Sequence, residues 1–282
     1  MKEICGDVSK ENNLSVLEKT QYFFHNLTRG LYGHHTWLWC KRLPAPTNFS
    51  KRITDSPMRF LLDNAFAEVI KRYVPAASLS VFDIGSGTAY YRSALAALGK
   101  SGTYTGLDVY RHPRYSDDAV PAFASSMIIR KIEDLVPTTT YDLVMSITAL
   151  EHIQDDQKAI TLSTALAGQN GVQVHIAPSF LSLFLYLWHG YRQYTPWRVK
   201  HLFKGLPYDV YRLGGWGSFL VHFLFITVPE RIIGLPSPRR FAIYHYSLRV
   251  GLFVDRLIPF GSIAYIVVVR PQKTYESSST KN

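Results

Sequence analysis

The sequence predicts an α/β protein built on a doubly wound, mostly parallel sheet. Apolar segments with strand character alternate with helical segments between residues 78 and 178, which is the pattern of repeated βαβ units. The turn Gly85-Ser86-Gly87 follows the first of these strands and precedes a helix, an arrangement by which doubly wound folds hold a nucleotide. Hydrophobic residues make up 47% of the 282 residues, so the chain is able to bury a full core.

The first predicted helix lies in "DSPMRFLLDNAFAEVIKRY", where Ser56 caps the helix and Pro57 suits its first turn. The following elements are a strand "LSVFDIG", a helix "TAYYRSALAALG" closed by Gly99, strands "GTYTGLDVY" and "SSMIIRKI", a loop "EDLVPTTT", a strand "YDLVMSITAL", a helix "DDQKAITLSTALAGQNG" and a strand "VQVHIAP". After Pro178 this alternation ends. A strand "PYDVYRLGG" and a last strand "SIAYIVVVR" (262–270) complete the prediction.

These elements divide the chain into five predicted segments. Residues 1–55 form an N-terminal arm, and residues 56–178 form the core that holds the cofactor. Residues 179–261 are rich in aromatic and basic side chains, and we expect them to form a cap over the substrate. Residues 262–270 return to the core as its final strand, and the polar residues 271–282 are expected to be disordered.

The positive charge of the chain is concentrated in two regions. The net charge is +10, and residues 179–240 hold eight Lys and Arg against two acids. Residues 28–61 hold six Lys and Arg against Asp55 alone. A basic surface favours an anionic partner, which leaves a phosphate-bearing substrate, an acidic membrane face and a nucleic acid as candidates.

The cysteines and the N-terminus favour a cytoplasmic location. Cys5 and Cys40 provide neither a disulfide framework nor a zinc-ligand spacing, so we expect no metal and a reducing compartment. The first fifteen residues are polar and lack the apolar segment of a signal peptide. The longest apolar stretches, 180–188 and 219–228, are shorter than the roughly 20 residues that cross a bilayer, and we expect core or pocket helices there.

The residues around the glycine turn favour a cationic ligand. Asp83 stands two residues before Gly85, where its carboxylate would repel the diphosphate of a dinucleotide. Tyr90 occupies the third glycine position of the dinucleotide fingerprint. S-adenosylmethionine carries an ammonium and a sulfonium and suits such a turn. Asp108, which ends the second strand, can accept hydrogen bonds from both ribose hydroxyls.

On these residues the chain resembles the class I S-adenosylmethionine-dependent methyltransferases, which have a Rossmann-like fold. "VFDIGSGTA" looks like their first motif, with Ala89 in its last glycine position, and "YTGLDVY" looks like their ribose-binding strand. "YDLVMSITALEHI" and "ALAGQNGVQVHIAP" resemble the family's fourth and fifth strands with their flanking turns. "SIAYIVVVR" fits the final strand, which is antiparallel in this family.

The resemblance implies a methyl-transferring enzyme with S-adenosylmethionine as cofactor, and it implies site residues. The turn Gly85-Ser86-Gly87 and Asp83 would hold the methionine end, and Asp108 would hold the ribose. The remaining implied cofactor contacts are Val109 on the adenine, Glu133 or Asp134 near the adenine, and Ser146 and Thr148 near the methyl group. Lys131 stands where relatives often place an Asp for the adenine amino group, so the adenine contact departs from the family pattern.

Three residues are candidates for catalysis. His152 follows Glu151 at a turn where this family often has the pair Glu-His, and it is either a structural or a catalytic residue. "HGYRQYTPW" (189–197) places His189 and Arg192 after the fifth strand, where segments line the ligand crevice. His189 could act as a general base and Arg192 could hold an anion, or both could belong to a buried polar turn.

The acceptor is predicted by exclusion and composition. The turn "SITALEHI" lacks the Asn/Asp-Pro-Pro-aromatic motif of base-amino methyltransferases, and the matching region lacks the cysteine that cytosine-C5 chemistry needs. We therefore expect O-methylation of a small-molecule, sugar or lipid-linked acceptor of anionic character, with peripheral contact to an anionic membrane. Two alternatives stay open: an RNA methyltransferase, and a non-catalytic module with the same fold.

Overall fold

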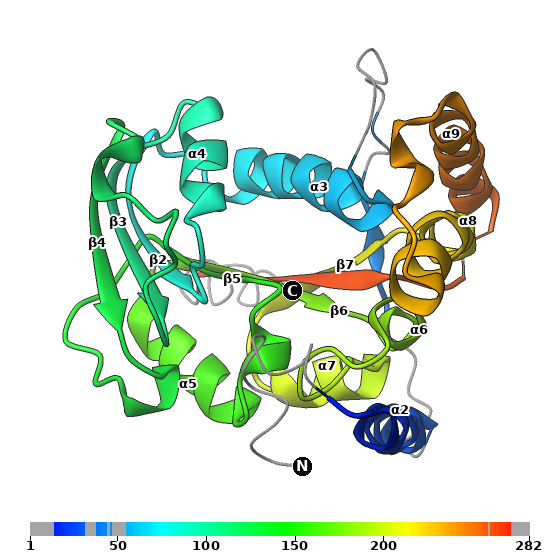
Figure 1. Ribbon diagram of the computed structural model, residues 1–282. Helices are drawn as coiled ribbons and strands as arrows, with labels where there is room; N and C mark the ends of the chain where they lie inside the picture. Colours follow the sequence, from blue (N-terminus) through cyan, green and yellow to red (C-terminus); the bar gives the residue numbers. More distant parts are fainter. Residues whose placement is uncertain (1–13, 32–37, 44–45, 47–54, 259, 272–282) are drawn as a thin grey trace, which may run out of the picture. The chain divides into compact units, whose positions relative to one another are not determined.

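The structure is a computed structural model that describes residues 14–31, 38–43, 46, 55–258 and 260–271 (Figure 1). The strands are β1 (Lys41–Arg42), β2 (Ser78–Ile84), β3 (Ser101–Asp108), β4 (Phe123–Ile129), β5 (Leu143–Ile147), β6 (Val172–Pro178), β7 (Tyr208–Leu213) and β8 (Ala264–Val269). They form a sheet in the order β1-β7-β8-β6-β5-β2-β3-β4, mostly parallel, with one antiparallel pairing. The predicted Rossmann-like fold class is confirmed.

The helices are α2 (Val16–Leu31), α3 (Pro57–Tyr73), α4 (Tyr90–Ala97), α5 (Asp156–Ala167), α6 (Ser182–Tyr186), α7 (Pro196–Leu202), α8 (Trp216–His222) and α9 (Ala242–Leu257). A π-helix, η4 (Phe223–Ile233), continues α8. Short 3-10 turns are η1 (Asp117–Ala119), η2 (Ile132–Asp134), η3 (Leu150–His152) and η5 (Pro238–Arg240). The helices α3, α4 and α5 lie where the sequence predicted them, whereas α2 lies in the predicted arm, for which no helix was expected.

The chain divides into two compact units. Unit 1 consists of Met1–Phe66, Pro178–Val199 and Tyr211–Tyr265, and unit 2 consists of Ala67–Ala177, Lys200–Val210 and Ile266–Asn282. Unit 1 thus takes the predicted arm together with most of the predicted cap. Most of the predicted tail lies outside the described residues.

Unit 2 forms around strands that are buried on both faces. All residues of β5 and β6 are buried, as expected for the centre of a parallel sheet. The helices α4 and α5 cover opposite faces of β2, β3 and β5 (Figure 1). The Asp155 carboxylate accepts the Lys158 N–H at 2.9 Å and caps α5, so this helix begins where its acids suit the helix dipole.

The register of three strands creates the edge on which a cofactor can lie. Ile84 at the end of β2 pairs with Leu107 of β3 and with Ser146 of β5. The carboxyl ends of these parallel strands therefore meet at one edge of the sheet. In open α/β sheets ligands bind outside this edge.

Unit 1 contains a helix pair that approaches very closely. A Cβ atom on Gly217 of α8 would lie 2.0 Å from the Gly251 carbonyl oxygen of α9, so the two backbones touch where neither residue has a side chain. Asp255 of α9 accepts the N–H groups of Gly217 at 2.7 Å and of Ser218 at 3.2 Å. The α9 helix thereby supplies the N-terminal cap that the sequence of α8 lacks.

One helical stretch of unit 1 differs from the sequence expectation. Among the described residues, α8 and η4 together give one helix, Trp216–Ile233, that is long and apolar enough to cross a membrane by length and composition. Only 39% of this stretch is buried, so most of its apolar residues are not part of a core. The sequence predicted a shorter core or pocket helix at 219–228, and the helix extends beyond those residues at both ends.

Candidate cofactor site

The glycine turn of unit 2 is held by its own main chain. The N–H groups of Gly85 and Ser86 both donate to the Leu107 carbonyl, at 2.8 and 3.1 Å, and the turn is thereby fixed to the end of β3. Gly85 has φ +71° and Gly87 has φ +52°, values that glycine adopts readily. A Cβ on Gly85 would also lie 2.5 Å from the Ala149 Cβ, so this position requires glycine for space as well.

Asp108 lies against the same turn. Its Oδ2 accepts the Gly87 N–H at 2.9 Å, and its Oδ1 accepts the Val109 N–H at 2.7 Å. These bonds orient the carboxylate at the carboxyl end of β3, where the sequence predicted a ribose contact. The Val109 side chain is 57% exposed, so it remains open to an apolar ring.

Asp83 is buried beneath the turn. Its carboxyl group accepts a hydrogen bond from the Tyr104 hydroxyl. Burial raises the pKa of Asp83 to about 7, the Tyr104 hydrogen bond opposes this, and the Asp108 carboxylate adds to it. The carboxyl group is therefore partly protonated near neutral pH, and a nearby cation would favour its ionised form.

A buried arginine supports this arrangement. Arg92 of α4 is only 1% exposed, and it donates to the carbonyls of Ser116 and Asp117 and to the Ser125 hydroxyl. Its guanidinium also lies 5.5 Å from the centre of the Tyr104 ring. Arg92 thus holds the ring whose hydroxyl bonds Asp83. Neither residue was predicted as part of the site. The alternation of β3 indicates that Tyr104 faces inward, but nothing in "TAYYRSAL" indicates that Arg92 is buried.

Ser146 lies near the end of β5 and Thr148 follows this strand, and the two predicted residues differ in their surroundings. Thr148 has φ +51°, which is rare for a β-branched residue, and its N–H donates to the Ile176 carbonyl at 2.8 Å. Such strain of about 1–3 kcal/mol is characteristic of functional sites. Ser146 is fully buried, and its hydroxyl lies 2.8 Å from Nδ1 of His175.

The Ser146 contact belongs to a network inside the sheet. The other ring nitrogen of His175 lies 3.1 Å from the Gln173 side-chain oxygen. Burial lowers the pKa of His175 to about 3, so the imidazole is neutral. Ser146 therefore serves the core in this structure, and a contact between Ser146 and the cofactor stays a prediction.

The remaining predicted residues of unit 2 lie on short turns. Glu133 is half-buried on η2, next to the exposed Asp134 and Lys131. His152 is half-buried on η3, and its neighbour Glu151 is 1% exposed. Ser86 is buried, and its hydroxyl has no partner among the described residues. This hydroxyl packs over Gly106 of β3, so Ser86 faces the sheet.

His189 and Arg192 belong to unit 1, between α6 and α7. The His189 carbonyl accepts hydrogen bonds from the Tyr22 hydroxyl at 2.8 Å and from the Gln193 amide at 2.9 Å. The Arg192 guanidinium lies 5.9 Å from the centre of the Tyr191 ring. Both side chains are half-buried, so neither is excluded from contact with a ligand.

The donor set of unit 2 suits a cationic ligand. Asp83 and Asp108 place two carboxyl groups at one turn, and the amide groups of that turn are bonded to protein acceptors. A diphosphate would meet negative charge there, and the N–H groups of Gly85, Ser86 and Gly87 are already bonded to other acceptors. An ammonium or sulfonium would meet two carboxyl groups instead. Asp83, the glycine turn, Asp108 and Val109 therefore fit S-adenosylmethionine.

Comparison with known proteins agrees with this geometry. Residues 82–172 match the family model described as a methyltransferase domain. This match and the fold support the class I S-adenosylmethionine-dependent methyltransferase superfamily. The chain is a methyl-transferring enzyme, and its methyl donor is S-adenosylmethionine. The predicted family, enzyme class and cofactor are thus confirmed. No curated protein matches the chain.

Solved structures share the fold at low sequence identity. A methyltransferase of Haloferax volcanii, solved in complex with the Trm112 methyltransferase activator, is 16% identical with a TM-score of 0.51, over 76% of this chain and 91% of that chain. The [4+2]-cyclase SpnF is 13% identical with a TM-score of 0.50, over 82% of this chain and 89% of that chain. At such identity the likeness concerns the fold alone, and the cyclase illustrates that this fold also serves other reactions.

Proposed function

We propose that this methyltransferase transfers the methyl group to oxygen in a small-molecule, sugar or lipid-linked acceptor of anionic character. We further propose that it works in the cytoplasm, in peripheral contact with an anionic membrane. The observation that carries the acceptor class is the surface of unit 1, which combines exposed apolar side chains with arginines. A substrate that carries both an apolar part and a negative charge would match such a surface.

The helix α9 is apolar on two sides. Tyr244, Leu248 and Leu252 are buried in unit 1. Large side chains at the helical spacing i, i+4, i+7 and i+11 are exposed instead, and their exposed fractions are 68% for Tyr246, 43% for Val250, 57% for Phe253 and 65% for Leu257. A second apolar stripe on a helix that already has a core face indicates a further partner.

The helix formed by α8 and η4 carries similar residues. Leu220 and Leu224 are exposed on it, and Ile232 and Ile233 are exposed at its end. Basic residues accompany both helices: Arg231, Arg239, Arg240, Arg249 and Arg256. A helix with apolar residues on one side and arginines at its borders favours the interface of an anionic bilayer. We therefore assign both exposed stripes to membrane contact.

The residues of unit 2 would hold the cofactor in this proposal. Asp108 would accept hydrogen bonds from the ribose hydroxyls, and Asp83 would face the positive charge of the methionine end. When bound, S-adenosylmethionine supplies an electrophilic methyl group on its sulfonium. An acceptor hydroxyl needs to lose its proton during the transfer, and His189 would take this proton while Arg192 holds the anionic group of the acceptor.

The test uses cofactor labelled with ¹³C in its methyl group. The full chain is incubated with fractions of a cell extract that contain lipids, polar small molecules, RNA or protein, and the labelled product is isolated. We expect the label in the lipid or small-molecule fraction, with the carbon chemical shift of a methyl bound to oxygen. The Asp108→Ala variant is the control for cofactor-dependent transfer. Label bound to nitrogen would overturn O-methylation, label in RNA would favour an RNA methyltransferase, and tight cofactor binding without any label would favour a non-catalytic module.

Membrane contact has its own test. The full chain is sedimented with vesicles of neutral lipid and with vesicles that contain anionic lipid. We expect binding to the anionic vesicles, and we expect the double variant Phe253→Ser, Leu257→Ser to lose most of it. Leu17→Ser on α2 is the matched control, because Leu17 is 66% exposed on another helix of unit 1. Equal binding by both variants would remove α9 from the contact.

A further inference from the structure

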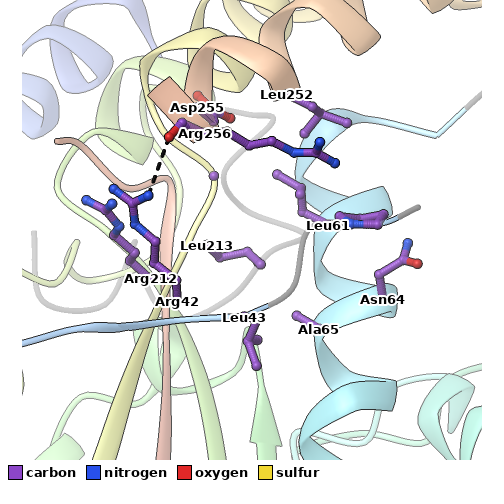
Figure 2. Close-up of a pocket in the computed structure, with 12 residues that line it drawn as sticks. Arg42, Leu43, Leu61, Asn64, Ala65, Arg212, Leu213, Leu252, Asp255 and Arg256 are labelled. Atoms are coloured by element: carbon purple, nitrogen blue, oxygen red, sulfur yellow. Dashed lines mark hydrogen bonds between the residues drawn. The ribbon is translucent and has the colours of Figure 1, made fainter. Parts of the chain in front are cut away.

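Unit 1 contains a pocket of about 450 Å³ that the cofactor residues do not share (Figure 2). Such a volume is in the usual range for small-molecule sites. Its walls come from β1 and the residues after it, from α3, from the end of β7 and from the end of α9. All lining residues belong to unit 1.

Three guanidinium groups line this pocket. Arg42 and Arg212 are paired residues of the neighbouring strands β1 and β7, so their side chains extend side by side (Figure 2). Arg256 comes from the last turn of α9. Burial, and then the charge of Arg42, lower the pKa of Arg212, and the interactions with Cys40 and Asp255 oppose this lowering only in part.

These arginines have few partners within the protein. Among the described residues, Arg42 donates only to the Arg256 carbonyl, at 3.4 Å. In the part of the chain that the structure describes, the guanidinium groups of Arg212 and Arg256 have no hydrogen-bonded partner. Asp255 also lines the pocket, but its carboxylate accepts the Gly217 and Ser218 N–H groups at the start of α8. Asp255 thus holds the start of α8, and its charge also offsets part of the positive charge of Arg212.

The opposite side of the pocket is mostly apolar, and Asn64 of α3 is its polar side chain. Leu61 and Ala65 of α3 and Leu252 of α9 are buried residues that line it (Figure 2). Leu213, at the end of β7, adds a further buried side chain between the paired arginines Arg42 and Arg212 and helix α3, whereas the Arg256 side chain extends from α9 toward Leu61 (Figure 2). A ligand that fills the pocket must therefore have an anionic end and an apolar end.

The charges select among anions. Three guanidiniums and one carboxylate leave a net charge of about +2, and a phosphate monoester carries about −1.5 to −2 at pH 7, whereas a carboxylate carries −1. Guanidinium groups also match phosphate oxygens in paired hydrogen bonds.

We propose that the pocket binds a phosphate monoester attached to an apolar chain, with the paired Arg42 and Arg212 on the phosphate, Arg256 adding positive charge from α9, and the leucines on the first part of the chain. The source is either a soluble alkyl phosphate or the headgroup of a membrane lipid. Because the proposal concerns binding by unit 1 alone, it does not depend on methyl transfer or on the identity of the acceptor.

The test measures binding of decyl phosphate to the full chain by calorimetry, below the concentration at which the probe forms micelles. We expect binding at least about tenfold tighter than that of decanoate or of inorganic phosphate, because each lacks one of the two recognised features. The double variant Arg42→Gln, Arg212→Gln should weaken it by more than about tenfold. The double variant Arg42→Lys, Arg212→Lys keeps the charge and loses the paired hydrogen-bond geometry. Its affinity for decyl phosphate should lie between that of the wild type and that of the glutamine variant.

A control variant and a second probe make the outcome decisive. Arg29→Gln removes an exposed arginine of α2 in unit 1, outside the pocket and outside the helices assigned to membrane contact, and it should leave the affinity unchanged. Vesicles with phosphatidic acid test the lipid source. If the pocket variants weaken binding to these vesicles, the ligand is the headgroup of a membrane lipid. If they weaken binding of decyl phosphate but not of the vesicles, the ligand is a soluble alkyl phosphate. Binding of either probe that survives the pocket variants, or decanoate that binds as tightly as decyl phosphate, would overturn the proposal.

Discussion

The glycine turn of unit 2 and the arginine pocket of unit 1 recognise charge in opposite ways. The turn Gly85-Ser86-Gly87 lies next to two carboxyl groups, those of Asp83 and Asp108, and its backbone amides are already bonded. The pocket collects three guanidiniums from three elements that lie far apart in the sequence. One site suits a cation and the other suits an anion.

The two sites also differ in how well the sequence predicts them. A turn depends on residues that are adjacent in the chain, so its glycines and acids form a motif that spacing alone identifies. A pocket depends on the fold, because Arg42 and Arg212 become neighbours only when β1 pairs with β7. The variants below test how far the turn depends on each of its parts, and whether changes in unit 1 leave it intact.

The largest effect is expected from Gly85→Ala. The new Cβ would meet the Ala149 Cβ at 2.5 Å, and alanine is strained at φ +71°. Overpacking and backbone strain together should cost about 3 kcal/mol or more. We expect either a loss of S-adenosylhomocysteine affinity of at least about 100-fold, measured by calorimetry, or a comparable loss in the free energy of unfolding, measured in urea.

Gly87→Ala is the matched control for this variant. Gly87 also has a positive φ, +52°, but a Cβ there would meet no atom within 4 Å. It should therefore cost only the backbone term of about 1–2 kcal/mol. Equal effects of the two substitutions would show that the contact with Ala149 does not matter.

The core elements could be predicted because their signals are local. The strands β2 to β6 are short apolar runs bounded by turns, and Ser56 accepts the Arg59 N–H at 3.2 Å, as its predicted role as a helix cap requires. The helix α2 was missed although its start carries a local signal: the Ser15 N–H donates to the Glu18 carboxylate at 2.8 Å and the Glu18 N–H donates to the Ser15 hydroxyl at 3.3 Å, which is a capping box. The full extent of the helix through α8 and η4 was missed because Pro229 interrupts its pattern.

Asp108→Ala should produce the second largest effect. A carboxylate that accepts hydrogen bonds from two ribose hydroxyls should contribute about 1.5–3 kcal/mol per bond. We therefore expect more than about tenfold weaker binding of S-adenosylhomocysteine by calorimetry. Asp108→Asn keeps an oxygen for the Gly87 N–H and should be milder. An unchanged dissociation constant in a folded Asp108→Ala variant would remove Asp108 from the site.

The side chains around the turn were less predictable than the turn itself. Asp83 was predicted beside a cation, but its bond with Tyr104 and the support from Arg92 depend on how α4 packs on β3. Ser146 was predicted near the methyl group because it lies near the end of a strand, and this contact stays a prediction. Its hydrogen bond with His175 on the neighbouring strand could not be predicted, because it depends on the register of β5 and β6. The sequence indicates where a residue lies along a strand, whereas the partners of its side chain depend on which elements pack against that strand.

The third effect is a pH dependence that arises from Asp83. Because the pKa is raised to about 7, roughly a tenth of these carboxyl groups are ionised at pH 6 and half at pH 7. A cationic ligand favours the ionised form, so the affinity for S-adenosylmethionine should rise about fivefold from pH 6 to pH 7. This range ends before the ammonium group of the ligand begins to lose its proton.

Asp83→Asn isolates this effect, because the amide oxygen can still accept from Tyr104 but does not titrate. The affinity of this variant should not change over the same pH range.

The free energy of unfolding gives an independent test of the raised pKa. The folded pKa lies above the ordinary 3.8, so the folded chain binds more protons between pH 4 and pH 7 and its free energy of unfolding should fall as the pH rises. A wild-type chain whose affinity and stability change no more than those of Asp83→Asn would contradict the raised pKa.

The smallest effect on the cofactor is expected from variants in unit 1. His189 and Arg192 are proposed to serve the acceptor, so Arg192→Ala should raise the KM for an anionic acceptor and His189→Ala should mainly lower kcat. Neither should change the affinity for S-adenosylhomocysteine by more than about threefold, because the proposed cofactor residues all belong to unit 2. His189→Gln removes the base but keeps a polar side chain, and it should match His189→Ala in kcat. If a folded variant loses cofactor binding, or if all three variants keep full methyl transfer, then residues 189–197 are structural and the acceptor lies elsewhere.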